Sequence, residues 1–359
     1  MASWRERLIP KKKLGFIVNP IAGIGGRVGL KGSDGQEIIK RARELGAVPT
    51  SPVRAVEALK RITPIKDSIE LITYPYDMGE DEARECGFNP RVIGSITKGR
   101  TTSVDTKNAA RDMLKLRVDL ILFAGGDGTA RDIFDAVGEK VPVLGIPAGV
   151  KIHSGVFAIN PRSAGDLAVA HLQEKPTVIR EAEVMDIDEQ AFRENRVSAK
   201  LYGYLRIPYE TTLVQSPKAG SIPGEESSME AIAYDITENM QDDYIYIIGP
   251  GTTTRPIMEK LGLKKTLLGV DVVHKGRLVA SDVSETQLLK LIEGKKAKII
   301  VTVIGGQGFI FGRGSQQISP EVIRKVGKEN ITIVATPNKL ASLKGMPLLV
   351  DTGDEEVDK

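Results

Sequence analysis

The sequence predicts an α/β fold: an open, doubly wound parallel sheet in the N-terminal part, followed by a second, mixed α/β domain. Short apolar runs alternate with segments of helical period, which is the pattern of βαβ units in a parallel sheet. Several of these runs end abruptly in glycine-rich turns, as strands buried on both faces do. With 359 residues the chain is long enough for two domains. We predict their limits at residues 1–155 and 156–359, and we allow the end of the chain to pack back on the first domain.

The composition excludes several classes of protein. Fifty basic and 47 acidic residues leave a net charge of +3, which is too balanced for a nucleic-acid-binding surface. A single cysteine, Cys86, excludes an intrachain disulfide and a cysteine-based zinc site. No apolar run approaches the roughly 18 residues of a membrane span, and the basic start lacks the apolar stretch of a signal peptide. We expect a cytoplasmic enzyme and a homo-oligomer that binds small molecules, without nucleic-acid or membrane partners.

Strands and helices are predicted to alternate through the first domain. The predicted strands are 14–18, 69–73, 92–94, 120–124 and 141–146. The predicted helices are 36–46, 52–62, 79–86, 101–116, a segment from the turn after residue 124 to Gly138, and 163–173.

Beyond residue 176 the pattern changes to alternation, and we predict an antiparallel pair, 177–188 and 197–208, that leads into the second domain. A loop is predicted at 215–227, a helix around Ile232 and Ile236, and a helix from the capping box at Ser284 to Ile292. Further strands are expected at 244–248, 267–273, 277–280, 297–304, 331–335 and 348–350, and further helices end at Leu261 and span 321–326. The acidic tail 351–359 is expected to fray.

The stretch 120–132 is the centre of the prediction. An apolar strand runs straight into Gly125-Gly126-Asp127-Gly128-Thr129, and a helix starts behind this turn. Glycines let the backbone approach a ligand closely, and Thr129 with the free N–H groups of the helix could hold a phosphate. Asp127 is an anion, so we interpret it as a magnesium ligand, direct or through water, or as a base for an attacking hydroxyl. The alternative is a plain turn in which Asp127 caps the helix.

Four further loops carry residues suited to an anion. The loop 19–35 has six glycines, with Arg27 and Lys31 as positive charges. In the loop 147–155, Lys151 could neutralise phosphate and His153 could bond phosphate or ribose. The turns at 249–255 and 305–314 add glycines, hydroxyls and Arg313, which could contact phosphate or ribose. Each loop also has a plainer interpretation. The loop 19–35 could be a solvated surface loop, and His153 could be a histidine with ordinary structural partners. At 249–255 the threonines could cap the helix, and at 305–314 the chain could form a simple turn. Because 19–35, 125–129 and 147–155 all follow parallel strands, we expect them at one sheet edge.

These motifs carry a resemblance to a known family. Gly125–Thr129 after a strand, together with Asn19-Pro20 and small residues after the first strand, resembles the NAD kinase and diacylglycerol kinase superfamily. The segments 29–35, 249–254 and 305–317 resemble its divergent branch of ATP-NAD kinase-like or AcoX-like proteins. One feature of NAD kinases, an Asn-Glu or Asn-Asp pair after the first domain, has no match between residues 156 and 215.

The resemblance implies an ATP-dependent kinase of two domains with a nucleotide cleft between them. By its place in the motif, Asp127 is the catalytic residue. The implied donor is ATP or polyphosphate with Mg²⁺, and the implied acceptor is NAD, which would become NADP; the metal ligands stay unassigned. The alternatives are a non-catalytic NAD(H) or ATP sensor, and a kinase for another small alcohol such as a sugar phosphate. The residues expected to bind the nucleotides are Asn19, Gly23, Gly25, Gly26, Arg27, Lys31, Asp34, Gly125, Gly126, Gly128, Thr129, Lys151, His153, Gly251, Thr252, Thr253 and Arg313.

Overall fold

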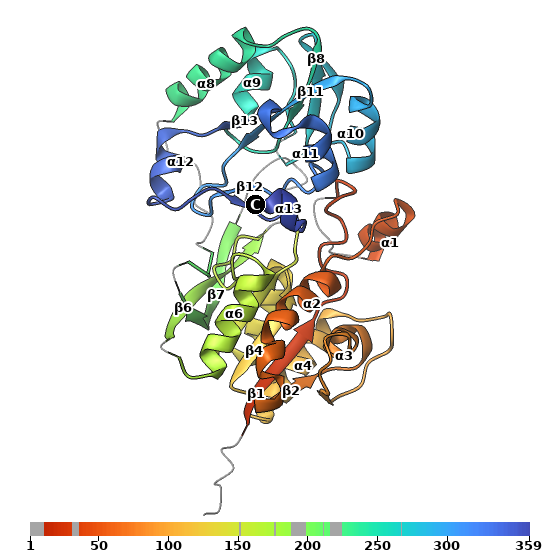
Figure 1. The fold of residues 1–359 in the computed structure, drawn as a ribbon, viewed down its shortest axis with the longest axis vertical. Helices are drawn as coiled ribbons and strands as arrows, with labels where there is room; N and C mark the ends of the chain where they lie inside the picture. The colour runs from red at the N-terminus through yellow and green to blue at the C-terminus, as the bar shows by residue number, and fades with distance from the viewer. Residues whose placement is uncertain are drawn as a thin grey trace, which may run out of the picture.

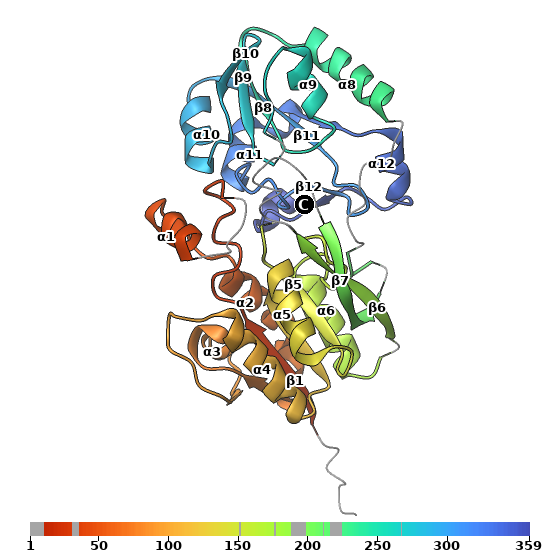
Figure 2. The same cartoon turned by 180° about the vertical axis from the view of Figure 1, so that it is seen from behind.

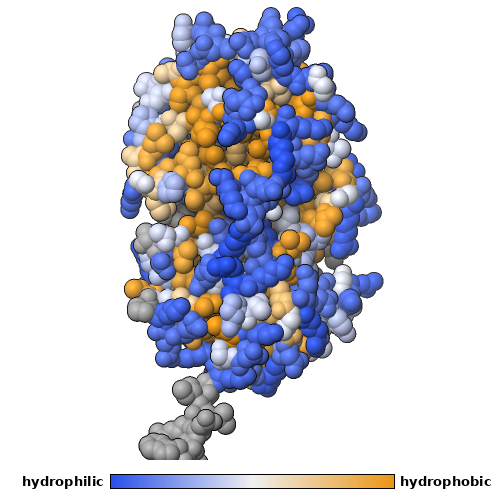
Figure 3. Space-filling model, viewed as in Figure 1, coloured by the Kyte–Doolittle hydropathy of each residue, from blue (hydrophilic) through white to orange (hydrophobic). Residues whose placement is uncertain are grey.

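The computed structural model shows two α/β lobes, one above the other, with the N-terminal half of the chain in the lower lobe and the C-terminal half in the upper (Figure 1). It describes residues 11–30, 36–150, 152–175, 177–187, 199–210, 212–215, 225–266 and 268–359. Among these, no helix is long and apolar enough to cross a membrane. On the face of the molecule seen in Figure 1, apolar surface is most extensive over the upper lobe (Figure 3).

The lower lobe is built on a five-stranded parallel sheet in the order β3-β2-β1-β4-β5. Residue Phe16 of β1 lies beside Leu122 of β4, and every residue of β4 is buried, as the unbroken apolar run predicts. The predicted doubly wound parallel sheet is therefore confirmed. The strands are β1 (Lys12–Val18), β2 (Ile69–Thr73), β3 (Arg91–Val92), β4 (Leu120–Gly125) and β5 (Val143–Pro147).

Helices cover both faces of this sheet. Figure 1 shows α2 and α6 side by side in front of it, and Figure 2 shows α4 and α5 on the opposite face. Right-handed crossovers on a twisted parallel sheet give this arrangement. The helices of the lobe are α1 (Gln36–Glu44), α2 (Ser51–Ile62), α3 (Glu80–Glu85), α4 (Ser103–Lys115), α5 (Asp127–Val137) and α6 (Pro161–Leu172), with 3₁₀ helices η1 (Thr63–Ser68) and η2 (Tyr76–Met78).

The antiparallel pair predicted near residues 177–208 is present as β6 (Val178–Ile187) and β7 (Ala199–Tyr209). Its apolar side chains, among them Val184 and Leu205, are buried in the same core as the first sheet, so the hairpin covers the lower lobe instead of opening the upper one. The lower core extends to Val214, and the upper cores begin at Ala233. We therefore propose that the change of domain falls between these two residues, later than residue 155.

The upper lobe contains a mixed sheet in the order β10-β9-β8-β11-β13, in which β8, β11 and β13 are parallel. One apolar core lies between this sheet and α10 and α11, and another between the sheet and α8 and α9. The capping box predicted at Ser284 is present. The elements are α8 (Glu226–Glu238), β8 (Tyr244–Ile248), α9 (Arg255–Lys260), β9 (Asp271–His274), β10 (Arg277–Ala280), α10 (Glu285–Ile292), β11 (Lys296–Thr302), α11 (Pro320–Val326), η3 (Lys328–Asn330) and β13 (Ile331–Val334).

The end of the chain is ordered, so the prediction of a frayed tail is wrong. Asp351 is only 4% exposed and forms an ion pair with Arg54 of α2 in the lower lobe, at 2.8 Å. Asp354 then caps a final helical turn by accepting the backbone N–H groups of Glu356 and Val357. Elements in this region that the sequence did not indicate are β12 (Phe309–Phe311), α12 (Pro337–Ser342) and α13 (Glu355–Asp358), while the expected β14 (Leu349–Val350) pairs with β12.

A buried carboxyl group in α3 predicts an unusual dependence of stability on pH. Glu82 is 5% exposed, and burial, reinforced by nearby Asp81 and Asp77, raises the pKa of its side chain from 4.5 to about 7. The folded state then binds this proton more tightly than the unfolded state, so the stabilisation is complete below pH 4.5 and is lost as the pH rises through 7. Glu82→Gln should increase the free energy of unfolding by ~3 kcal/mol at pH 8 and change it little near pH 4.5.

Urea unfolding at the two pH values tests this expectation. Glu230→Gln is the control, because Glu230 of α8 is exposed and is not among the charges that raise the pKa of Glu82. Equal pH dependence in the Glu82→Gln protein and the unmodified protein would contradict a buried, protonated Glu82.

Candidate active site

The loops that follow β1 and β4 meet at the carboxyl edge of the first sheet. These strands are neighbours, and their crossover helices α2 and α5 pack on opposite faces of the sheet, so the sheet has its topological switch point here. Asn19 joins the two loops: its Nδ2 donates to Thr129 Oγ1 at 2.9 Å, and its backbone N–H donates to Ala124 O at 3.0 Å. In open α/β sheets the ligand crevice lies at such a switch point.

Glycine is required where the turn after β4 touches the loop after β5. Gly125 O accepts the backbone N–H groups of Ala148 at 2.9 Å and Gly149 at 3.0 Å. A Cβ added to Gly149 would lie 2.7 Å from Gly126 Cα, closer than side chains approach backbone in folded proteins. The third predicted loop therefore does share this edge, held backbone to backbone against the Asp127 turn.

Asp127 is held from the side of the loop 147–155. It is 8% exposed, its Oδ2 accepts the backbone N–H of His153 at 2.8 Å, and its Oδ1 accepts that of Ser154 at 3.0 Å. The N-cap of α5 is Gly126 and no side chain caps this helix, so the interpretation of Asp127 as a helix cap is wrong. The carboxylate lies in the first turn of α5, where the helix dipole stabilises negative charge.

Three buried amide and hydroxyl groups support the loop that holds Asp127. Ser154 was expected to contact phosphate or ribose, and this supporting role was not predicted for any of the three. Gln215 Nε2 donates to Ser154 O at 2.8 Å, and Ser154 Oγ accepts the backbone N–H of Met185 at 2.9 Å. From the upper lobe, Gln307 Nε2 donates to Ile152 O at 3.1 Å. The hairpin, Gln215 and the segment after β11 thus help to fix the position of the carboxylate, and no signal in the sequence indicated these contacts.

Two predicted ligand residues have structural partners in this arrangement. The Thr129 side chain is 3% exposed and accepts Asn19 Nδ2, so its hydroxyl braces the two loops. His153 is 5% exposed and its Nδ1 lies 3.4 Å from Asp127 Oδ2, on the carboxylate's supporting side. Lys31, Asp34 and Lys151 lie outside the described residues.

The glycines of the first loop are placed for close packing. Gly23 has φ +78°, and a Cβ there would lie 2.2 Å from Ala148 O, so only glycine fits. A Cβ at Gly26 would lie 3.3 Å from Gln316 Cβ in the upper lobe. Arg27 is exposed, and its carbonyl accepts the backbone N–H of Glu285 at 3.1 Å. The loop therefore contacts the upper lobe through its backbone, and the Arg27 side chain stays at the surface.

The predicted threonine turn follows β8 at the carboxyl edge of the second sheet. Gly251 has φ +129°, and Thr254 Oγ1 closes the turn by donating to Gly249 O at 2.9 Å. Thr253 is fully buried, and its Oγ1 forms no hydrogen bond within the described part of the chain. The turn thus lies between a strand and a helix, as predicted, on a different sheet from Asp127, and anion binding there stays a prediction.

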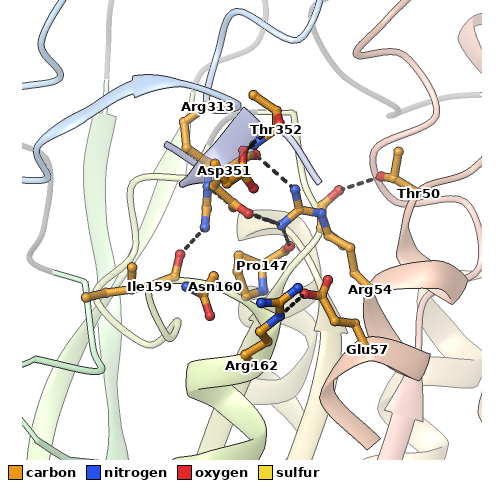
Figure 4. A network of polar contacts seen from close by, with 12 residues as sticks. Thr50, Arg54, Glu57, Pro147, Ile159, Asn160, Arg162, Arg313, Asp351 and Thr352 are labelled. Atoms are coloured by element: carbon orange, nitrogen blue, oxygen red, sulfur yellow. Dashed lines mark hydrogen bonds and ion pairs between the residues drawn. The ribbon is translucent and has the colours of Figure 1, made fainter. Parts of the chain in front are cut away.

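Arg313 is buried at the junction of the lobes, where it has structural partners, and a contact with phosphate or ribose stays a prediction. Its Nε donates to Asp351 Oδ2 at 3.0 Å and its Nη2 donates to Ile159 O at 2.8 Å. Arg54 shares the same carboxylate and also donates to Pro147 O at 3.3 Å (Figure 4). Burial is the main cause that lowers the pKa of Arg313 to about 10. Sequence reasoning missed Arg54 and Asp351, which are 297 positions apart.

The donor set suits a magnesium ion that arrives on phosphate groups. Among the described residues, no three His, Cys, Asp or Glu side chains gather to hold a metal. Mg²⁺ characteristically keeps several waters and binds through one or two carboxylates together with substrate phosphates. Asp127 is the buried carboxylate at this edge of the sheet, and it fits that mode.

Glycine-rich loops that meet at a switch point, beside a helix N-terminus and one buried carboxylate, are typical of α/β proteins that bind phosphate groups. The family models give the particular class: that of the ATP-NAD kinase N-terminal domain matches residues 14–175, and that of the ATP-NAD kinase C-terminal domain matches residues 241–359. The chain belongs to the ATP-NAD kinase family, so the resemblance seen in the sequence is confirmed. This family consists of ATP-dependent phosphotransferases with an alcohol acceptor.

Comparison with other proteins gives distant matches. No curated protein matches the chain. Among solved structures, "a putative diacylglycerol kinase from Bacillus anthracis str. Sterne" is 18% identical over 50% of this chain and 46% of that chain, with a TM-score of 0.24. A structure of a diacylglycerol kinase from the same organism is 16% identical over 64% of this chain and 54% of that chain, with a TM-score of 0.22. The chain spans about half the length of these proteins.

Proposed function

We propose that the protein transfers the γ-phosphoryl group of ATP to a hydroxyl of NAD and forms NADP, with Asp127 as the catalytic residue. The observation that carries the proposal is the buried Asp127 carboxylate at the N-terminus of α5, at the switch point of the sheet. Membership of the ATP-NAD kinase family supports this donor and this type of acceptor.

The arrangement suits a reaction that depends on positioning and charge. The first N–H groups of a helix have no partner within it, so those of α5 can bind phosphate oxygens. Asp127 accepts one N–H on each oxygen, and a carboxylate has about four acceptor sites in all. The remaining sites can accept the hydrogen bond of the attacking hydroxyl.

In the reaction, the acceptor oxygen forms a bond to the γ-phosphorus as the bond from that phosphorus to the β-γ bridging oxygen breaks. ADP leaves, and Asp127 receives the proton of the hydroxyl. Rigid support by His153 and Ser154 keeps the carboxylate in line, and a group fixed in this way does not have to reorganise during the reaction. Magnesium, when bound with the nucleotide, neutralises charge on the phosphates.

The direct test is incubation of the protein with ATP, Mg²⁺ and NAD, followed by chromatography for NADP and ADP. We expect the two products in equal amounts. If no NADP forms but ADP and a phosphorylated product form with another alcohol, such as a sugar phosphate, the protein is a kinase and NAD is not its acceptor. Polyphosphate in place of ATP tests the donor.

A second candidate is a sensor that binds NAD(H) or ATP without transfer. It is favoured by one observation, the lack of an Asn-Glu or Asn-Asp pair between residues 156 and 215. Saturable binding of NAD in calorimetry, with no phosphorylated product from any alcohol, would support the sensor over the kinase. A cytoplasmic location and a homo-oligomer stay proposals from the sequence; light scattering tests the second.

A further inference from the structure

The loop that holds the catalytic carboxylate, residues 147–155, is itself held from both lobes. Near its start, the bonds to Gly125 described above tie it to the lower lobe. Near its end, the backbone N–H of Gly155 donates to Glu183 O at 2.9 Å, also in the lower lobe. The middle of the loop, residues 150–152, has partners in the upper lobe, so its position depends on the contact between the lobes.

Two backbone carbonyl groups in the middle of the loop accept hydrogen bonds from the upper lobe. Val150 O accepts the backbone N–H of Gly314 at 3.0 Å and Nε2 of Gln316 at 2.8 Å. Ile152 O accepts Nε2 of Gln307 at 3.1 Å. Gln307, Ile152 and Val150 are only 3%, 4% and 8% exposed. A carbonyl group that lost its donor here would be left buried without a partner, which is unfavourable.

Gln307 acts on Asp127 through a single peptide group. The carbonyl of Ile152 and the N–H of His153 are the two ends of one peptide unit, which is planar and rigid. The carbonyl end accepts from Gln307, and the N–H end donates to Asp127 Oδ2 at 2.8 Å. A donor at the carbonyl polarises the peptide and strengthens the hydrogen bond that its N–H donates. Rotation of this unit would withdraw the N–H from the carboxylate.

A tight turn fixes Gln307 to the upper lobe. The backbone N–H groups of Gln307 and Gly308 both donate to Ile304 O, at 3.2 and 2.9 Å. Gly306 and Gly308, on either side of Gln307, have φ of +77° and +82°, which glycine adopts without strain. Because the turn holds the amide in place, the amide would leave Ile152 O if the lobes moved apart.

We infer that Gln307 is a positioning residue for Asp127, and that Gln316 assists it through Val150. The carboxylate takes its position for catalysis only while the two lobes are in contact. The inference rests on the proposed function, because that function assigns catalysis to Asp127. The hold of the upper lobe on the loop does not depend on it.

Gln307→Met tests the inference, because methionine keeps the length of the side chain and removes the amide. Asn330→Leu is the matched control. Asn330 Nδ2 also donates to a backbone carbonyl of the upper lobe, Val326 O at 2.8 Å, but it directly precedes β13, at the opposite edge of the second sheet. Steady-state kinetics with ATP, Mg²⁺ and the acceptor, and hydrogen exchange of the His153 and Ser154 amides, compare both variants with the unmodified protein.

In Gln307→Met we expect exchange at His153 and Ser154 to become roughly fivefold faster, as the loss of one hydrogen bond predicts. The value of kcat should fall by roughly tenfold, because the carboxylate is displaced. KM for ATP should stay within about twofold, since the lost contact acts on the transition state and not on nucleotide binding. Asn330→Leu should change neither the exchange nor kcat.

Gln316→Met is a second variant that keeps the test if Gln307→Met does not fold. Gln316 is less buried than Gln307, and Val150 O keeps the N–H of Gly314 when the Gln316 amide is removed. We therefore expect smaller changes in the same direction.

Each part of the inference has its own contrary result. Unchanged exchange at His153 and Ser154 in both glutamine variants would overturn the hold of the upper lobe on the loop. Faster exchange with the kcat of Asn330→Leu, or a raised KM with unchanged kcat, would overturn the positioning role. If the unmodified protein transfers phosphate to no alcohol, the proposed function fails, and the exchange rates alone then decide whether the upper lobe holds the loop.

Discussion

Asp127→Asn is expected to lower the turnover number by roughly 10²-fold or more, the usual scale for loss of a general base. The structure adds a second expectation. Both carboxylate oxygens accept backbone N–H groups, from His153 and Ser154. Asparagine keeps one acceptor and places an amide NH₂ against the other N–H, so the free energy of unfolding should also fall by about 1–3 kcal/mol.

A control must therefore separate catalysis from loosening of the loop. Gln215→Leu removes the bond from Gln215 Nε2 to Ser154 O, which holds the same loop from its other side, and leaves the Asp127 carboxylate intact. We expect a similar loss of stability and a much smaller loss of turnover. Steady-state kinetics and urea unfolding of both variants provide the comparison. If the two variants lose turnover equally, Asp127 acts only by holding the loop in place and takes no part in catalysis.

Gly149→Ala should disrupt the active site without changing any polar group. The added Cβ would lie 2.7 Å from Gly126 Cα, and backbone cannot yield as a flexible side chain does. The loop 147–155 would have to move away from the Asp127 turn, at a cost of about 1–3 kcal/mol in stability. A displacement near 1 Å at a catalytic group can reduce the rate by roughly 10²-fold.

Gly155→Ala is the matched control in the same loop. A Cβ there would lie 3.1 Å from Glu183 Oε2, the end of a flexible side chain that can rotate away. Thermal unfolding and kcat/KM should change little in Gly155→Ala and strongly in Gly149→Ala. Comparable effects of the two substitutions would mean that the contact between Gly126 and Gly149 does not position the site.

The first sheet and its edge could be predicted because the signals are local. The apolar run 120–124 and the glycines after it specify a buried strand and a turn within a few residues, and parallel strands end at a common edge. The meeting of Asn19 with Thr129 follows from that rule and is present. The sequence shows that Gly126 and Gly149 both lie in loops at this edge. It does not show that they touch each other, because that contact depends on the tertiary structure.

Long-range pairs escaped prediction for a physical reason. Asp351 lies in an acidic tail that has no apolar run, and its burial depends on Arg54, 297 positions away. The β6–β7 hairpin was assigned to the second domain because the change in pattern at residue 176 is visible, whereas its packing against the first core is not. Gln215 and Gln307 support the Asp127 loop through backbone carbonyls, and such bonds leave no pattern in a sequence.

The central claim is that the Asp127 turn carries phosphoryl transfer to a hydroxyl. Its most direct test is a reaction with γ-³²P-labelled ATP, Mg²⁺ and NAD, run in parallel with the unmodified protein, Asp127→Asn and Gln215→Leu. We predict label in NADP with the unmodified protein and with Gln215→Leu, and a loss of roughly 10²-fold with Asp127→Asn. Label transfer by Asp127→Asn at the unmodified rate, or no transfer to any alcohol by the unmodified protein, would contradict the claim.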